Sequence, residues 1–210
     1  MKNLLNYQSS EYDCGPVSLT NALRFLFQRE ELAPDMLRAI SLYTLDAFGE
    51  EGLAGGRGTS RFAMQFLANW FNQYGACRNF PIEAQFAGGE LVFLSPASAV
   101  TACLQQGGAA VVRCYLEEDP HYVLLTAALG DDVGLFDPYF MERAEFDALA
   151  SGARFVADQP RLMNRVVSAA RLNQTDTAHY ALGPLEAREA LLLFNQRTRR
   201  TEANAIEYMI

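Results

Sequence analysis

The 210-residue sequence predicts an α+β domain in which an N-terminal helical half packs against a C-terminal antiparallel sheet. Two observations support this prediction. In the first third of the chain, apolar residues recur at three- and four-residue spacing, which is typical of amphipathic helices. After residue 108 the pattern changes to short β-rich runs separated by turn residues, which is typical of an antiparallel meander.

Three helices are expected in the N-terminal half. The first begins near Pro16, because proline's missing N–H and fixed φ suit the first turn of a helix, and it places Cys14 at the helix N-terminus. The second covers residues 35–47. The third follows a glycine-rich loop, opens with Thr59-Ser60 as its N-cap and is closed by Gly75.

A fourth, short helix leads into the sheet, with Ser95 as its N-cap and residues 106–108 as its end. Strands with tight turns between them are then expected over residues 109–116, 121–129 and 133–137. The central one is apolar, so we expect it to be buried on both faces. Beyond it, we expect a brief helix over residues 142–149 and strands over residues 166–171, 180–182 and 190–195.

Composition and charge argue against several classes of protein. Half of the residues are hydrophobic (50%), as in ordinary globular chains. The net charge is −8 and no basic residues cluster densely, so we expect no nucleic-acid partner. The apolar stretch 123–129 is far shorter than the ~20 residues of a membrane-spanning helix. Because the N-terminus also lacks the hydrophobic segment of a signal peptide, we expect a cytoplasmic protein.

The four cysteines show no Cys-x-x-Cys spacing, so we expect neither a metal site nor disulfides, and we expect no cofactor. They are Cys14, Cys77, Cys103 and Cys114. The last three lack a context that suggests chemistry, and we interpret them as reduced thiols that act as small apolar residues.

Cys14 has a different context. It lies at the predicted start of a helix, before Gly15-Pro16 and six residues after Gln8. Backbone N–H groups and the positive end of the helix dipole favour a thiolate there, which is the nucleophilic form of cysteine. The Gln8 amide and the backbone N–H of Cys14 can both donate to the oxyanion that forms when a thiolate attacks a carbonyl. Gln8 is therefore a candidate oxyanion-hole donor.

A thiolate mechanism needs a base, and the chain contains two histidines. His121 begins one predicted strand and Asp137 ends the next, so a tight turn between the strands allows Asp137 to orient His121. The rival pair, His179 and Asn195, has the same separation in sequence. The interval between the rivals contains a Gly-Pro pair and a charged stretch, which suit two neighbouring strands less well and favour His121.

Together these residues resemble the bacterial papain-like peptidases that cut leader peptides after a double glycine in bacteriocin maturation, and their stand-alone relatives. The resemblance rests on Gln8…Asp13-Cys14-Gly15-Pro16, on Gly58-Thr59-Ser60, on His121-Tyr-Val-Leu-Leu and on Phe136-Asp137-Pro138. It implies a papain-like cysteine peptidase fold. In that fold Cys14 is the nucleophile, His121 the general base, Asp137 the residue that orients His121, and Gln8 an oxyanion-hole donor.

The resemblance covers about residues 8–140. We expect residues 1–160 to form the peptidase core and residues 161–210 to form a C-terminal extension that packs on the same domain. The best-studied members of the family are fused to a membrane transporter and an ATPase. This sequence shows neither a membrane-spanning segment nor the lysine-containing phosphate loop of an ATPase, so the resemblance is to a stand-alone member.

The expected function is hydrolysis of a bond in a peptide or protein substrate through a thioester acyl-enzyme. Two alternatives stay open. The same thioester can pass its acyl group to an amine, as in a transferase, or the cleft can bind peptides without turnover. The sequence identifies neither the substrate nor the oligomeric state.

Overall fold

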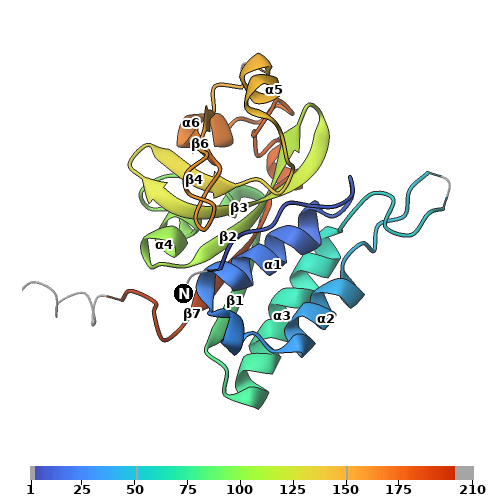
Figure 1. Ribbon diagram of the computed structural model, residues 1–210, viewed down its shortest axis with the longest axis vertical. Helices are drawn as coiled ribbons and strands as arrows, with labels where there is room; N and C mark the ends of the chain where they lie inside the picture. The colour runs from blue at the N-terminus through green and yellow to red at the C-terminus, as the bar shows by residue number, and fades with distance from the viewer. Residues whose placement is uncertain (1–2, 51, 150, 202–210) are drawn as a thin grey trace, which may run out of the picture.

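An antiparallel sheet organises the fold (Figure 1). The computed structural model describes residues 3–50, 52–149 and 151–201. The strands found there are β1 (Ile82–Gly88), β2 (Ala109–Leu116), β3 (Asp119–Leu129), β4 (Asp132–Phe136), β5 (Arg154–Phe155), β6 (Arg165–Ser168) and β7 (Glu189–Asn195). Within the described residues they form a seven-stranded sheet of order β1-β7-β2-β3-β4-β6-β5, with every neighbouring pair antiparallel.

Three helices from the N-terminal half lie together on one face of this sheet, as Figure 1 shows. They are α1 (Cys14–Leu26), α2 (Pro34–Tyr43) and α3 (Arg61–Arg78). The first packs on β2 and β3, and the third packs on β1 and β7. A buried apolar core fills the space between them, with Leu19, Leu23, Leu67, Phe71 and Leu124 among its members. The predicted architecture, a helical half on an antiparallel sheet, is confirmed.

The opposite face of the sheet is covered by α4 (Ala99–Gln105), which packs on β2, β3 and β7, and by the segments around two further short helices. These helices are α5 (Arg143–Ala148) and α6 (Ala169–Leu172), and the 3₁₀ turns are η1 (Arg29–Glu31), η2 (Gly89–Leu91) and η3 (Leu185–Ala187). A second apolar core lies on this side. Because β3 is covered on both faces, its residues 121–126 are all buried, as the apolar run predicts.

Three predicted helix ends differ from the structure. Helix α2 ends at Tyr43, before residue 47, because Leu45 takes a left-handed φ of 57° that an α-helix cannot contain. Helix α3 continues through Gly75 to Arg78. Gly75 serves close packing rather than termination, since a Cβ there would lie 2.9 Å from the Ile82 carbonyl oxygen. Ser98, not Ser95, is the N-cap of α4, and its side chain accepts from the N–H of Thr101.

The strand predictions were correct in the centre of the sheet and less so at its ends. The run 109–116 matches β2, whereas the edge strand β1 was missed. Only the first part of 166–171 is a strand, because Ser168 caps α6. The expected strand at 180–182 is wrong: Tyr180 has a left-handed φ of 64°, which interrupts an extended run.

The described part of the expected C-terminal extension belongs to the same sheet as the rest of the chain. Strand β7 lies between β1 and β2, and β6 lies beside β4. The remaining residues of that expected segment, 202–210, lie outside the described residues. None of the helices described has the length and apolar character needed to cross a membrane.

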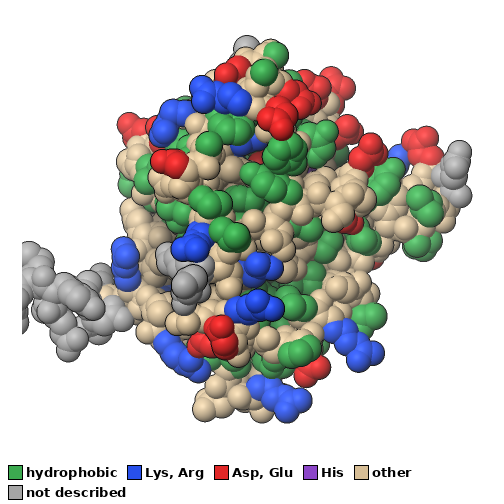
Figure 2. All heavy atoms as spheres, in the orientation of Figure 1, with side chains coloured by type: hydrophobic (Ala, Val, Ile, Leu, Met, Phe, Trp, Pro, Cys, Tyr) green, Lys and Arg blue, Asp and Glu red, His purple; other side chains and the backbone are tan. Residues whose placement is uncertain are grey.

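The net charge of −8 is unevenly distributed over the face drawn in Figure 2. Acidic side chains gather at the end of the molecule that carries α5, while basic side chains are more frequent over the helical half. An acidic ligand approaching this face is therefore repelled more strongly at the α5 end.

Candidate active site

Cys14 is the first residue of α1, and the close approach of another segment fixes its surroundings. The next residue, Gly15, lies against Thr59, just before α3, and a Cβ on Gly15 would come within 2.4 Å of the Thr59 Oγ1 atom. Only glycine fits there without displacing Thr59. The Cys-Gly pair and the Gly-Thr-Ser motif, far apart in sequence, are therefore in contact at the N-terminus of α1.

One hydrogen bond ties α1 to the strand that carries His121. The Ser18 hydroxyl donates to the backbone carbonyl of Tyr122 over 3.0 Å, and both groups are buried. Ser18 lies one helical turn after Cys14, while Tyr122 follows His121 in β3. This bond fixes the start of α1 relative to the first residues of β3.

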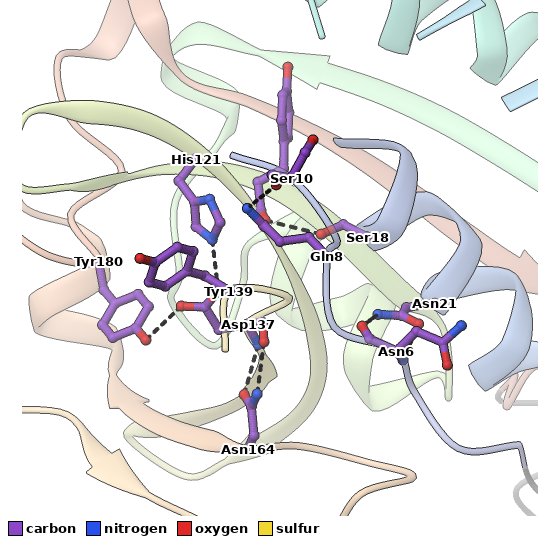
Figure 3. A network of polar contacts seen from close by, with 11 residues as sticks. Asn6, Gln8, Ser10, Ser18, Asn21, His121, Asp137, Tyr139, Asn164 and Tyr180 are labelled. Carbon is purple, nitrogen blue, oxygen red and sulfur yellow. Dashed lines mark hydrogen bonds and ion pairs between the residues drawn. The ribbon is translucent and has the colours of Figure 1, made fainter. Parts of the chain in front are cut away.

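The antiparallel pairing of β3 with β4 brings His121 and Asp137 together. The register pairs Leu124 with Phe136, so Asp137 follows directly beyond the end of β4. The His121 Nε2 atom lies 2.7 Å from the Asp137 Oδ1 atom, and both side chains are buried (Figure 3). The two residues chosen from the sequence are thus hydrogen-bonded to each other.

Asp137 is held by three further residues (Figure 3). The backbone N–H of Tyr139 donates to Oδ1 over 2.9 Å, and the Tyr180 hydroxyl donates to Oδ2 over 2.8 Å. The Asn164 side chain accepts from the Asp137 N–H and donates to its carbonyl. Reasoning from the sequence missed Asn164 and Tyr180, because an isolated Asn and Tyr carry no pattern that relates them to Asp137.

The electrostatics of the cluster favour a charged cysteine. Burial raises the pKa of the Cys14 thiol. The hydrogen bond and positive charge of His121, together with backbone groups of Tyr122 and Gly15, lower that pKa by more than burial raises it, so it lies below its ordinary value. Burial lowers the pKa of His121, but the charge and hydrogen bond of Asp137, together with Cys14, raise it to about 10. The stable form is therefore a thiolate beside an imidazolium.

Asp137 is the anion that supports this pair. Burial raises the pKa of its carboxyl, yet the charge and hydrogen bond of His121 and the donors Tyr139 and Tyr180 outweigh burial and lower the pKa overall. Since Nε2 of His121 is bonded to Asp137, the remaining ring nitrogen, Nδ1, is the atom available to Cys14.

Two of the other cysteines lie in environments that oppose ionisation. Burial raises the pKa of Cys103 to about 12. Burial and the charge of Asp137 raise the pKa of Cys114, which pairs with His121 across β2 and β3, well above its ordinary value. The third, Cys77, is exposed on α3. Only Cys14 combines a lowered pKa with a histidine partner among the cysteines.

The rival pair from the sequence is not assembled. Within the described residues, neither ring nitrogen of the buried His179 has a hydrogen-bond partner, and burial lowers its pKa to about 4. Asn195 instead donates from Nδ2 to the Leu26 carbonyl over 3.0 Å and accepts from the backbone N–H of Arg197. His121, not His179, is the histidine that lowers the pKa of Cys14.

Gln8 lies in the segment that precedes α1 and is anchored near Asp137. Its backbone N–H donates to the Pro138 carbonyl over 2.8 Å, and its side-chain Nε2 donates to the Ser10 carbonyl over 2.9 Å (Figure 3). A primary amide carries two N–H donors, so one donor on Gln8 remains after the Ser10 bond.

The site contains no evident place for a metal ion. Among the residues that the structure describes, no group of three or more His, Cys, Asp or Glu side chains is arranged to hold one. The surface hollows of the described residues include one of about 620 Å³ beside α3 and β1 and one of about 900 Å³ between the end of α1 and the end of α4, both away from this site.

Comparison with known proteins gives structural neighbours only. No protein-family model and no curated protein matches the chain. Among solved structures, the chain is similar to the peptidase domain of Streptococcus ComA, a bi-functional ABC transporter involved in a quorum-sensing pathway. The identity is 12%, the TM-score 0.45, and the match covers 92% of this chain and 98% of that chain.

Two further solved structures are similar in the same way. The peptidase domain of Streptococcus mutans ComA matches at 12% identity with a TM-score of 0.40, over 91% of this chain and 98% of that chain. A double glycine motif protease from an AMS/PCAT transporter, in complex with the leader peptide, matches at 17% identity with a TM-score of 0.36. That match covers 70% of this chain and 85% of the other. At such identities, the function of this chain has to be argued from its own residues.

Proposed function

We propose that this chain is a cysteine peptidase in which Cys14 is the nucleophile, His121 the general base and Asp137 the residue that orients His121. The observation that carries the proposal is the buried hydrogen bond between Asp137 and Nε2 of His121, and His121 in turn lowers the pKa of Cys14 at the start of α1. A nucleophile, a base and a group that orients the base are the components that acyl transfer requires. The motif resemblance around Cys14 supports the same assignment and a peptide or protein substrate.

The proposed reaction follows from this arrangement. The Cys14 thiolate adds to the substrate carbonyl carbon, and the carbonyl π electrons move onto oxygen. The imidazolium of His121 then donates its proton to the leaving amine as the carbon–nitrogen bond breaks. Neutral His121 takes a proton from water, which attacks the thioester and releases the acid with regeneration of the Cys14 thiolate and the imidazolium.

Two donors are available for the oxyanion of the tetrahedral intermediate. Within the described residues, the backbone N–H of Cys14 donates to no other group, as expected for the first turn of a helix. The second N–H of the Gln8 amide is the other proposed donor. Each such donor contributes on the order of 10²- to 10³-fold to kcat.

Digestion of a peptide library, read by mass spectrometry, tests the proposal. The wild-type chain is expected to cut a subset of the peptides, and Cys14→Ala is expected to remove every cut. The matched control is Cys77→Ala, which removes an exposed thiol and should leave the cut set unchanged. Cleavage that survives Cys14→Ala would contradict the assignment of Cys14, and loss of cleavage in Cys77→Ala would contradict the assignment to one thiol.

A further inference from the structure

The Asp137 carboxylate accepts hydrogen bonds from other groups besides His121. Its Oδ1 atom accepts from His121 and from the Tyr139 N–H, whereas the Tyr180 hydroxyl donates to Oδ2. The side chain of Asp137 is 3% exposed, so water reaches it poorly. A buried carboxylate oxygen without a donor is costly, and within the described residues Tyr180 is the donor to Oδ2.

Tyr180 reaches Asp137 through an unusual backbone conformation. Its φ of 64° lies in the left-handed region, which is uncommon and unfavourable for a residue with a bulky side chain. Two backbone hydrogen bonds with Tyr115 in β2 hold this conformation. The Tyr180 N–H donates to the Tyr115 carbonyl over 2.8 Å, and the Tyr115 N–H donates to the Ala181 carbonyl over 3.0 Å. A strained conformation that the fold stabilises on both sides is consistent with a functional constraint on the direction of this side chain.

Asn164 holds the backbone of the same residue. Its Oδ1 accepts from the Asp137 N–H over 2.7 Å, its Nδ2 donates to the Asp137 carbonyl over 2.8 Å, and its own N–H donates to the Leu135 carbonyl. These bonds continue the hydrogen-bond ladder beyond the end of β4, with a side chain in place of a strand. Asn164 is buried, so no solvent competes for these groups.

We infer that Asn164 and Tyr180 are positioning residues of the active site, which fix the backbone and the second carboxylate oxygen of Asp137 so that Oδ1 is directed at His121. This inference rests on the proposed function. Both residues belong to the segment after residue 160, so that segment supplies part of the site and does not merely cover the sheet.

Tyr180 influences the pKa of Cys14 through the Asp137 carboxylate and the His121 imidazolium. Loss of the hydroxyl leaves Oδ2 with no donor among the described residues, so the carboxylate is less stabilised and freer to rotate. A carboxylate that rotates away from Nε2 of His121 stabilises the imidazolium less, and a histidine that is protonated less of the time stabilises the Cys14 thiolate less. The pKa of Cys14 is therefore expected to rise and that of His121 to fall when the hydroxyl is removed.

Tyr180 keeps its proton over the range in which this effect is measured. The groups that act on it electrostatically are Asp137, Arg165 in β6 and Cys114 in β2, and the His179 ring packs edge-on against it. Burial and the negative charge of Asp137 raise the pKa of the Tyr180 phenol well above its ordinary value. The hydroxyl therefore remains a donor while Cys14 titrates.

The experiment measures Cys14 alkylation by iodoacetamide against pH, with peptide cleavage as a second readout. Tyr180→Phe removes one oxygen and keeps the ring. Tyr115→Phe is the matched control, because Tyr115 is a buried neighbour whose hydroxyl has no hydrogen-bond partner in the described part of the chain. We expect Tyr180→Phe to raise the alkylation pKa of Cys14 by about one unit and to lower kcat/KM about tenfold, mainly through kcat.

The outcomes separate the inference from the proposed function. If the wild type shows no lowered Cys14 pKa and cuts no peptide, the proposed function fails. If the wild type shows both and Tyr180→Phe matches Tyr115→Phe, only the positioning inference fails. A purely structural role would lower the melting temperature without moving the alkylation pKa, and that result also overturns the inference.

A second variant keeps the inference testable where Tyr180→Phe folds poorly. Asn164→Ala removes both side-chain hydrogen bonds to the Asp137 backbone without adding a charge. The same rise in the Cys14 alkylation pKa is expected, and Asn164→Ala with an unchanged pKa would contradict a positioning role for Asn164.

Discussion

At the scale of single residues, the adjacency of His121 and Asp137 could be predicted from the sequence. Two antiparallel strands joined by a tight turn have a fixed register, so residues near the open ends of the two strands meet. The register of β3 and β4 shows this, with Leu124 opposite Phe136. The chemistry of a cysteine at a helix start is similarly local, because it depends on the first turn of α1.

The supports of Asp137 could not be predicted in this way. Asn164 reaches it from the chain before β6, and Tyr180 reaches it from a loop with a left-handed residue. Neither contact follows from a periodicity or a turn signal, because both depend on the three-dimensional path of the chain after β4. Local patterns therefore predict the reacting groups better than the groups that hold them.

The charges of the site predict how peptide cleavage depends on pH. In the proposed mechanism, the active form has Cys14 ionised and His121 protonated. The pKa of Cys14 is lowered and that of His121 is raised to about 10, so kcat/KM should rise as pH increases through the lowered Cys14 pKa. It should then fall as His121 loses its proton near pH 10.

The measurement is a pH profile of kcat/KM on a cut peptide, with Asp137→Asn beside the wild type. Without the carboxylate the imidazolium is less stable, so the alkaline limit should move to lower pH and kcat should fall on the order of 10²-fold. An alkaline limit that stays in place in Asp137→Asn would show that Asp137 does not stabilise the imidazolium.

At the scale of elements, helix existence was predicted better than helix ends, and edge elements were predicted worst. Strand β1 was missed although Ile82 and Ala84 face the core. Its one neighbour within the described sheet is β7, which comes more than a hundred residues later in the chain. The sequence predicts that Gly75 ends the helix, whereas in the structure a glycine is required there by close packing against Ile82. Glycine has more than one structural use, and the sequence alone does not distinguish among them.

The contact between α1 and the start of α3 predicts the effect of a substitution at Gly15. Gly15→Ala places a Cβ within 2.4 Å of Thr59 Oγ1, so either Thr59 or the N-terminus of α1 must move. Overpacking of this kind costs about 1–3 kcal/mol in the free energy of unfolding, and displacement of Cys14 should also slow its alkylation. Urea denaturation and the iodoacetamide rate measure the two effects.

A double-mutant cycle tests whether Thr59 is the cause. Thr59→Ala removes the nearest atom, so Gly15→Ala should cost less in that background than in the wild type. Gly88→Ala is the matched control, since its nearest contact, with Phe86, lies at an ordinary 3.5 Å. Equal costs of Gly15→Ala in both backgrounds would mean that the steric explanation is wrong.

At the scale of the whole molecule, one sheet contains strands from the expected peptidase core, residues 1–160, and from the described part of the expected C-terminal extension, residues 161–201. The motif resemblance ends near residue 140, whereas β7, which begins at Glu189, lies between β1 and β2. The site has the same character, since Cys14 comes from α1, His121 and Asp137 from the middle of the chain, and Tyr180 from the segment after residue 160. A site assembled from all parts of the chain depends on the complete sheet.

This topology predicts that a chain of residues 1–160 does not fold. Without β7, strand β1 loses its one neighbour in the described sheet and β2 gains an unpaired edge, while the buried apolar residues of β7 no longer fill either core. The apolar residues of β7 alone include Leu191, Leu192, Leu193 and Phe194, and burying each contributes about 1.5–3 kcal/mol, comparable in sum to the whole stability of a domain. Far-UV circular dichroism and size-exclusion chromatography should therefore show an unfolded or aggregated fragment.

The matched control is the full chain cut at a protease site introduced at the exposed residues 157–159, which should remain folded with both pieces held together by the sheet. A cooperative thermal transition and normal Cys14 alkylation in the 1–160 fragment would show instead that β7 and Tyr180 are dispensable for both the fold and the site.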